Sequence, residues 1–169
     1  QVKVESAAVV AVEALLRWDY APFGPVAPNV VVALAEEAGL VGELGDWVIR
    51  AACARMRQWR EADCVPGVTM SINLSPTQLN PAGFAGRIHD ILRTHGLSAD
   101  DIEFEITESR AVAHSERTAH TLDQLARRGI RLAIDDFGMG YSSLLYMRRF
   151  DIHAIKLDGS LTREILTNP

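Results

Sequence analysis

Residues 102–135 read IEFEITESRAVAHSERTAHTLDQLARRGIRLAID, and the order of patterns in this stretch predicts the fold. Residues 102–107 and 130–135 are rich in apolar and β-branched side chains, which is typical of β-strands. Between them, residues 116–128 carry apolar positions at helical spacing, and Gly129 ends that helix. Strand, helix and strand in this order predict a βαβ unit with two parallel strands.

The same alternation continues on both sides of this stretch. Strands are predicted at residues 9–16, 68–74 and 152–157, and helices at 29–38, 46–61, 84–92, just after residue 143 and from Ser160 onward. Asn29 is predicted to cap its helix, and residues 19–28, with three prolines and a glycine, are predicted to form a loop. The helix at 46–61 is predicted to bury one apolar stripe, made of Trp47, Val48, Ala51, Ala52, Met56 and Trp59.

The composition indicates one ordinary globular α/β domain. The chain has 169 residues, of which 48% are hydrophobic and 23% charged. A net charge of −5 argues against a DNA-binding protein, which would need a basic surface. No apolar run approaches the roughly 18 residues of a membrane span. Cys53 and Cys64 are predicted to be free thiols, which together with the lack of a secretory signal predicts a cytoplasmic protein.

Most of the predicted strands end in a polar side chain that an apolar core would not favour. The clearest are Glu13, Asn73, Glu105, Asp135 and Lys156. Intervals of about 30 residues separate the middle three, which is the length of one strand–helix unit of a (β/α)8 barrel. We therefore predict that these side chains meet at the carboxyl ends of parallel strands, where barrel enzymes have their active sites.

These residue types indicate a metal site. Three carboxylates and an amide at one place repel one another without a cation, and oxygen ligands favour a hard ion such as Mg²⁺, Mn²⁺ or Ca²⁺. Asp136 adds a carboxylate for a second ion, and two ions can activate a water and stabilise the leaving oxygen of a phosphodiester. Lys156 could position that water, and Arg17 could bind a phosphate oxygen.

Each of these residues also has a purely structural explanation. An acidic residue at a strand end is commonly a helix cap or a turn residue. Residues 73–76 could start a helix, residues 135–138 could form a turn, and Lys156 and Arg17 could be surface charges. The row would also suit an enolase-like metal barrel that acts on a carboxylate substrate.

Short motifs around these residues resemble those of the EAL domain family. Residues 13–18 (EALLRW) carry the motif that names the family, and residues 34–39 (LAEEAG) resemble its LAEETG helix. Its other motifs follow in the family's order at residues 73–75 (NLS), 105–109 (EITES), 135–143 (DDFGMGYSS) and 156–158 (KLD). The resemblance covers essentially the whole chain and implies an EAL-type (β/α)8 TIM-like barrel over residues 1–169.

The resemblance also implies an activity, because EAL enzymes use Mg²⁺ or Mn²⁺ to linearise cyclic di-GMP to pGpG. By motif, the implied metal ligands are Glu13, Asn73, Glu105, Asp135 and Asp136. Glu13 and Asp136 are then also catalytic, together with Lys156, which resembles the lysine that assists the attacking water.

Three further roles follow from the same resemblance. Arg17 resembles a contact to the substrate phosphate, and Asp158 a residue beside the ligand. Glu108 resembles the residue that steadies the loop after Asp136, which in the family is tied to metal binding and to dimer contact. We therefore expect a homodimer. Fused sensory or GGDEF-type domains are common in the family.

Two features depart from the family pattern. Met139 stands where the family usually has threonine, and the chain ends at Pro169, before the family's AEGVE-like and QGY-like strands. We therefore expect a barrel that is incomplete at the C-terminus. The alternative hypothesis is a catalytically inactive EAL module that binds cyclic di-GMP or a protein partner. A third is a scaffold that binds neither metal nor nucleotide.

Overall fold

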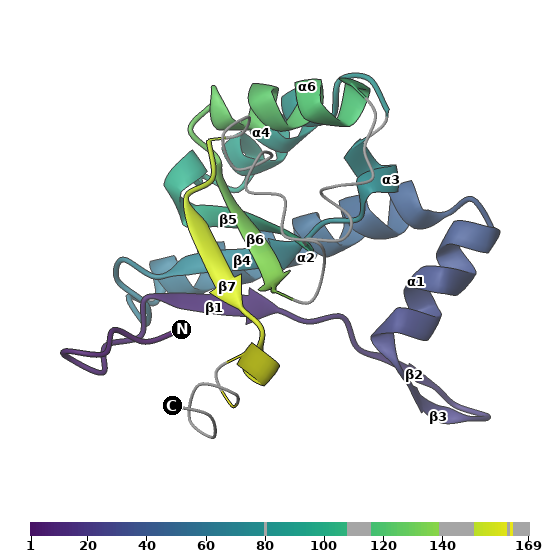
Figure 1. Ribbon diagram of the computed structural model, residues 1–169, viewed down its shortest axis with the longest axis horizontal. Helices are drawn as coiled ribbons and strands as arrows, with labels where there is room; N and C mark the ends of the chain where they lie inside the picture. The colour runs from purple at the N-terminus through teal and green to yellow at the C-terminus, as the bar shows by residue number, and fades with distance from the viewer. Residues whose placement is uncertain (80, 108–115, 139–150, 162, 164–169) are drawn as a thin grey trace.

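The computed structural model describes residues 1–79, 81–107, 116–138, 151–161 and 163. In this part of the chain, five parallel strands form one sheet in the order β1-β4-β5-β6-β7 (Figure 1). Their bounds are Ala11–Ala14 (β1), Thr69–Asn73 (β4), Ile102–Thr107 (β5), Arg131–Phe137 (β6) and Ala154–Leu157 (β7). The predicted βαβ unit is confirmed, because β5 and β6 pair in parallel and helix α6 (Glu116–Ala126) lies between them in the chain.

One face of the sheet is apolar and packs against helices. The side chains on this face are buried, and they include Met70, Ile72, Phe104, Ile106, Leu132 and Ile134. They form one core with residues of α2 (Val41–Glu61), α4 (Phe84–Thr94) and α6. Phe104 meets Phe84 of α4 with ring centroids 6.4 Å apart. The other face of the sheet is therefore left for polar side chains.

Residues 19–28 do not form the predicted loop. Strands β2 (Trp18–Tyr20) and β3 (Gly24–Val26) pair as an antiparallel hairpin, which lies beside α1 (Pro28–Glu37) and away from the sheet (Figure 1). The prolines misled the prediction, because a two-stranded hairpin has two edges and tolerates proline there. Trp18, Tyr20 and Phe23 form a row of tilted ring contacts, with centroids 5.4 and 5.7 Å apart.

The predicted cap of α1 is also wrong. The helix begins at Pro28, Ala27 is its N-cap residue, and Asn29 lies in the first turn. Proline is well suited to this position, because its missing N–H would have no intrahelical partner there. None of the residues of α1 is buried.

Helix α2 begins at Val41, five residues before the predicted start. The predicted stripe is confirmed in part, because Val48 and Trp59 pack against the core whereas Ala51 is exposed. Ala52 and Met56 are buried as predicted, but Trp47 is 59% exposed and Ile49 is 1% exposed. Cys53 joins the core, and burial raises the pKa of its thiol to about 12. Both cysteines are free, as predicted. No described helix combines the length and apolar character needed to cross a membrane.

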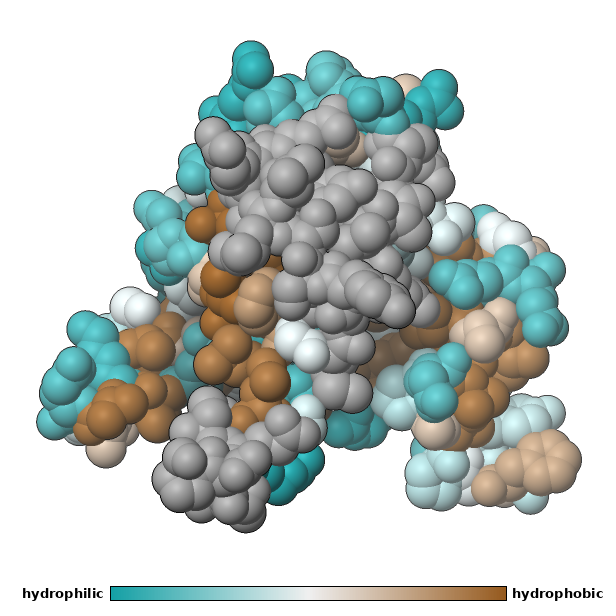
Figure 2. Space-filling model, viewed as in Figure 1, coloured by the Kyte–Doolittle hydropathy of each residue, from teal (hydrophilic) through white to brown (hydrophobic). Residues whose placement is uncertain are grey.

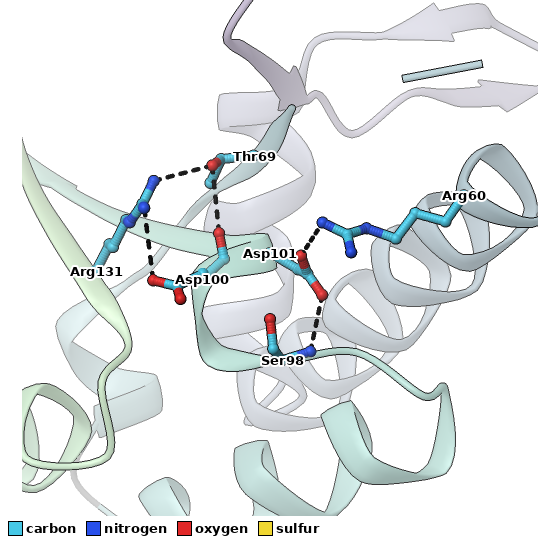
Figure 3. Close-up of polar contacts among 6 residues, drawn as sticks. All are labelled: Arg60, Thr69, Ser98, Asp100, Asp101 and Arg131. Carbon is cyan, nitrogen blue, oxygen red and sulfur yellow. Dashed lines mark hydrogen bonds and ion pairs between the residues drawn. The ribbon is translucent and has the colours of Figure 1, made fainter. Parts of the chain in front are cut away.

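Polar contacts tie the elements together at the amino ends of the strands (Figure 3). The Arg131 guanidinium donates to Thr69 Oγ1 at 3.1 Å and pairs with Asp100 at 3.4 Å. Arg60 of α2 pairs with the buried Asp101 in the short 3-10 helix η1 (Ala99–Asp101). The Asp101 carboxylate also accepts from the Ser98 N–H at 2.7 Å. These charges are matched within the cluster.

Candidate active site

Polar side chains share the face of the sheet that the helices do not cover. In parallel pairing, residues in register point to the same side, and side chains alternate along each strand. Asn73 is in register with Glu105, Glu105 with Ala133, and Ala133 with Ala154. The same face therefore carries Glu13, Ser71, Asn73, Glu103, Glu105, Thr107, Asp135 and Lys156. The structure thus places five predicted site residues on one face.

Glu105 lies at the centre of this row. It is 1% exposed, and Lys156 Nζ donates to its Oε1. Burial raises the pKa of Glu105, while the hydrogen bond and the charge of Lys156 act in the opposite direction. Lys156 reaches across β6 because the residue in between is the small, buried Ala133.

Two buried oxygen atoms at the end of β5 have no hydrogen-bond partner among the described residues. They are Glu105 Oε2 and Thr107 Oγ1. Buried polar atoms in folded proteins are nearly always paired, so an orphaned pair at one strand end marks a place where a ligand would bind. Thr107 is in register with Asp135 on β6, which brings a further carboxylate to the same strand ends.

Glu13 and Asn73 are held together on the other side of Glu105. Asn73 Nδ2 donates to Glu13 Oε1 at 2.7 Å across the β1–β4 pair. The structural alternative for residues 73–76 also holds, because helix α3 (Pro76–Leu79) begins at the last of them. Asn73 therefore ends a strand, and Pro76 begins the helix.

Strand β6 is irregular where its two aspartates stand. Its pairing with β7 shifts register between Ile134 and Phe137, and Asp136 has a positive φ of 53°. This conformation is uncommon for any residue other than glycine, and aspartate is among those that tolerate it best. Burial and then the charges of Asp135, Asp158 and Glu13 raise the pKa of Asp136. These three carboxylates are therefore near enough to repel a charge on Asp136.

The remaining predicted residues lie at different distances from this row. Asp158 follows β7, and its Oδ1 accepts from the Ser160 N–H at 2.7 Å. Hydrogen bonds from the Ser160 side chain and from this N–H lower the pKa of Asp158. Asp158, and not Ser160 as predicted, therefore caps the helical residues that follow. Arg17 is exposed after β1, and its guanidinium donates to Leu16 O at 2.8 Å. Glu108, Met139 and the short helix predicted after residue 143 lie outside the described residues.

Sequence reasoning missed three polar residues on this face. The Ser71 hydroxyl donates to Glu103 Oε1 at 3.1 Å, and both residues are buried beneath the row. Thr107 completes the set. The signal was present in residues 102–107, where Glu103, Glu105 and Thr107 alternate with Ile102, Phe104 and Ile106.

The donor set is of the kind that binds a hard divalent cation. Carboxylate and amide oxygens meet at the strand ends, and the orphaned Glu105 Oε2 is an oxygen that a cation would satisfy. As they stand, no three Asp, Glu, His or Cys side chains of the described residues converge as a ligand group. The residues fit a metal in chemical type, and Lys156 provides the positive charge beside Glu105.

A cleft of about 330 Å³ opens beside Asn73 and Thr107. It is bounded by α1, α2 and the ends of β1 and β4, and its lining is mostly apolar, with Glu36, Ser75 and Gln78 among its polar residues. An apolar cleft with a few polar groups next to the row is the form that small-molecule sites usually take.

The family model described as the EAL domain matches residues 1–169, and the chain belongs to this family. The bifunctional diguanylate cyclase/cyclic di-GMP phosphodiesterase MucR of Pseudomonas aeruginosa is 36% identical over 157 residues, which are 93% of this chain and 23% of MucR. The chain spans between 18% and 27% of the length of such curated relatives.

Solved structures of the family share the fold. The MucR phosphodiesterase in complex with cyclic di-GMP has a TM-score of 0.88 and 34% identity, and the match covers 99% of this chain and 67% of that chain. Klebsiella pneumoniae BlrP1, in a manganese and cyclic di-GMP complex, has a TM-score of 0.79 and 30% identity over 95% of this chain and 39% of that chain. The five strands described above therefore belong to an EAL-type (β/α)8 TIM-like barrel, as predicted.

Proposed function

We propose that this chain binds cyclic di-GMP and, with a divalent cation, hydrolyses one of its phosphodiester bonds to give linear pGpG. The observation that carries the proposal is the buried Glu105 carboxylate, which is paired with Lys156 on one oxygen and orphaned on the other. It stands beside the Asn73–Glu13 pair at the carboxyl ends of the strands. The names of MucR and of its cyclic di-GMP complex support the choice of substrate.

The cation, Mg²⁺ or Mn²⁺, would be held by Glu13, Asn73, Glu105 and Asp135, with Asp136 serving a second ion. Bound there, it would activate a water and neutralise charge on the phosphate. The manganese complex of BlrP1 supports a metal of this class.

The other residues act on the substrate and the water. Lys156 orients the attacking water and neutralises negative charge with its ammonium group. The exposed Arg17 binds a non-bridging phosphate oxygen once its guanidinium leaves Leu16 O. Asp158 lies beside the ligand, and Glu108 stabilises the loop after Asp136.

The remaining features of the proposal concern the protein as a whole. Residues 1–169 form part of one EAL domain in a cytoplasmic protein, and the domain forms a homodimer through the loop after Asp136. Sensory or GGDEF-type domains in the same polypeptide are proposed by analogy with MucR, whose name carries two activities.

A catalytically inactive module that binds cyclic di-GMP or a protein partner is the second candidate. The pairing of Lys156 with Glu105 favours it, because that contact already neutralises the carboxylate which a catalytic metal would need. The phosphodiesterase and the nucleotide-binding form of this module differ in turnover and not in nucleotide binding.

Turnover of cyclic di-GMP tests the proposal directly. We expect the protein to form pGpG in the presence of Mg²⁺ or Mn²⁺, and chromatography would detect this product. Product formation should stop when the metal is chelated. Glu105→Gln should lower kcat at least about a hundredfold, because it removes a ligand charge. Glu43→Gln, on the exposed face of α2, is the matched control and should keep full activity.

The other outcomes decide between the candidates. Nucleotide binding without turnover would contradict the phosphodiesterase and support the inactive module. No nucleotide binding at all would contradict the phosphodiesterase and the nucleotide-binding form of the module.

A further inference from the structure

The turn between β4 and α3 directly follows Asn73, which lies in the candidate site. Hydrogen bonds hold this turn on two sides. The Leu74 N–H donates to Glu105 O at 2.8 Å, which ties the turn to β5. The Ser75 N–H donates to Gln78 Oε1 at 2.6 Å, and the Gln78 N–H donates back to Ser75 O at 3.0 Å. Ser75 and Gln78 are both buried.

This arrangement is one half of a capping box. Ser75 stands at the N-cap of α3, and the glutamine three residues later accepts from the backbone N–H of the cap. Leu74 and Leu79 flank the box and are buried, as in a hydrophobic staple. Because the site is buried, water is a poor substitute for Gln78 as the partner of the Ser75 N–H.

Gly45 of α2 makes the position of Gln78 possible. A Cβ at residue 45 would lie 1.4 Å from Gln78 Nε2 and 2.6 Å from its Cδ. Glycine is otherwise unfavourable inside a helix, and Gly45 is in the interior of a helix of 21 residues. The close approach is a physical reason for glycine at this position, independent of the capping contact.

We propose that Gln78 is a positioning residue for Asn73, and that Gly45 holds Gln78 in place. This inference rests on the proposed function, since it takes Asn73 as a metal ligand. Only Leu74 separates Asn73 from the cap residue Ser75: Gln78 fixes Ser75, and the hydrogen bond to β5 fixes Leu74. Asn73 directly precedes them and donates to Glu13 at 2.7 Å. The amide of Asn73 is therefore oriented by residues that are not among the proposed metal ligands.

The test measures the affinity of the protein for Mn²⁺, by the spin-resonance signal of the free ion. Gln78→Ala and Gly45→Ala should each weaken Mn²⁺ binding about tenfold, as expected for residues that orient a metal ligand. The double variant should be no weaker than Gln78→Ala alone, because both changes break one contact. Gln78→Glu keeps the acceptor oxygen and should restore most of the affinity.

Gly42→Ala is the matched control, because it lies on the same helix and a Cβ there would meet nothing within 4 Å. If Gly45→Ala and Gln78→Ala bind Mn²⁺ as tightly as Gly42→Ala does, the inference is overturned. If Gln78→Glu is as weak as Gln78→Ala, the acceptor is irrelevant and the inference also fails. An unsubstituted protein that binds no Mn²⁺ would instead contradict the proposed function.

Discussion

The ion pair between Lys156 and Glu105 shows what the candidate site requires of single residues. A carboxylate that is 1% exposed is costly without a positive charge beside it, and the lysine meets that need across one intervening strand. A cation bound at the second oxygen of Glu105 would compete with Lys156 for the charge of the same carboxylate. Lys156 would then be released to act on water or phosphate, which joins its structural and its proposed catalytic roles.

Removal of this lysine should reveal the buried charge. Burial holds the pKa of Glu105 above its ordinary value, so the native state keeps a proton that the unfolded state has already released. Stability therefore falls as pH rises from the unfolded pKa to the folded one. In Lys156→Met the pKa of Glu105 rises further, because Lys156 no longer lowers it, so the pH range over which stability falls becomes wider. We expect a loss of about 3 kcal/mol at neutral pH, at the low end for a broken buried pair because the Lys156 side chain is 21% exposed.

Denaturant unfolding at neutral pH and near the ordinary pKa of glutamate would measure this loss, which should be smaller at the acidic pH. The control is the double variant Lys156→Met with Glu105→Gln, which has no charge left to titrate at the pair. An equal loss in Lys156→Met at both pH values would show that the buried charge is not its cause.

At the scale of elements, helix α2 shows that hydrophobic periodicity alone does not decide which face of a helix is buried. The predicted stripe included Trp47, but the helix buries Val41, Gly45, Ile49, Ala52, Cys53 and Met56. The hydrophobic pattern around Trp47 and Val48 is compatible with either stripe, and only the contact with the sheet selects one. The exposed Trp47 consequently contributes little to the core.

Truncation of two residues on α2 tests this register. Ile49→Ala should lower the free energy of unfolding by about 3 kcal/mol, because it leaves a cavity in the core. Trp47→Ala should cost less than about 1 kcal/mol, because most of that side chain is in water. Thermal or denaturant unfolding measures both. A larger loss for Trp47→Ala than for Ile49→Ala would contradict the observed face of α2.

At the scale of the molecule, α1 and the β2–β3 hairpin form an arm that contributes little to the core. α1 has no buried residue, and it exposes the apolar side chains of Val30 and Leu34. The hairpin exposes Phe23. Figure 2 shows apolar surface in the region of α1. Isolated hairpins and short helices are only marginally stable in water. Local stability should therefore be lower here than in the sheet.

Hydrogen exchange measured by mass spectrometry tests this difference. Amides of α1 and the hairpin should exchange much faster than those of β4 and β5, whose opening approaches global unfolding. Helix α4 is a suitable comparison, since it has 11 residues against 10 in α1 but buries five of them. Protection of α1 equal to that of α4 would show that the arm is stabilised by contacts other than core burial.

The sequence by itself determined the alternation of strands and helices and the row of polar residues at the strand ends. These properties are local: side-chain periodicity defines the faces of an element, and the intervals between strands define the repeating unit. The placement of Glu13, Asn73, Glu105, Asp135 and Lys156 on one face follows from that repeat.

Only the tertiary structure decided which of these groups meet. The Lys156–Glu105 pair joins residues 51 positions apart, and the Asn73–Glu13 pair joins residues 60 apart. The approach of Gln78 to Gly45 and the buried face of α2 likewise depend on packing between distant segments. Such contacts depend on the relative position of whole elements, which local periodicity does not encode.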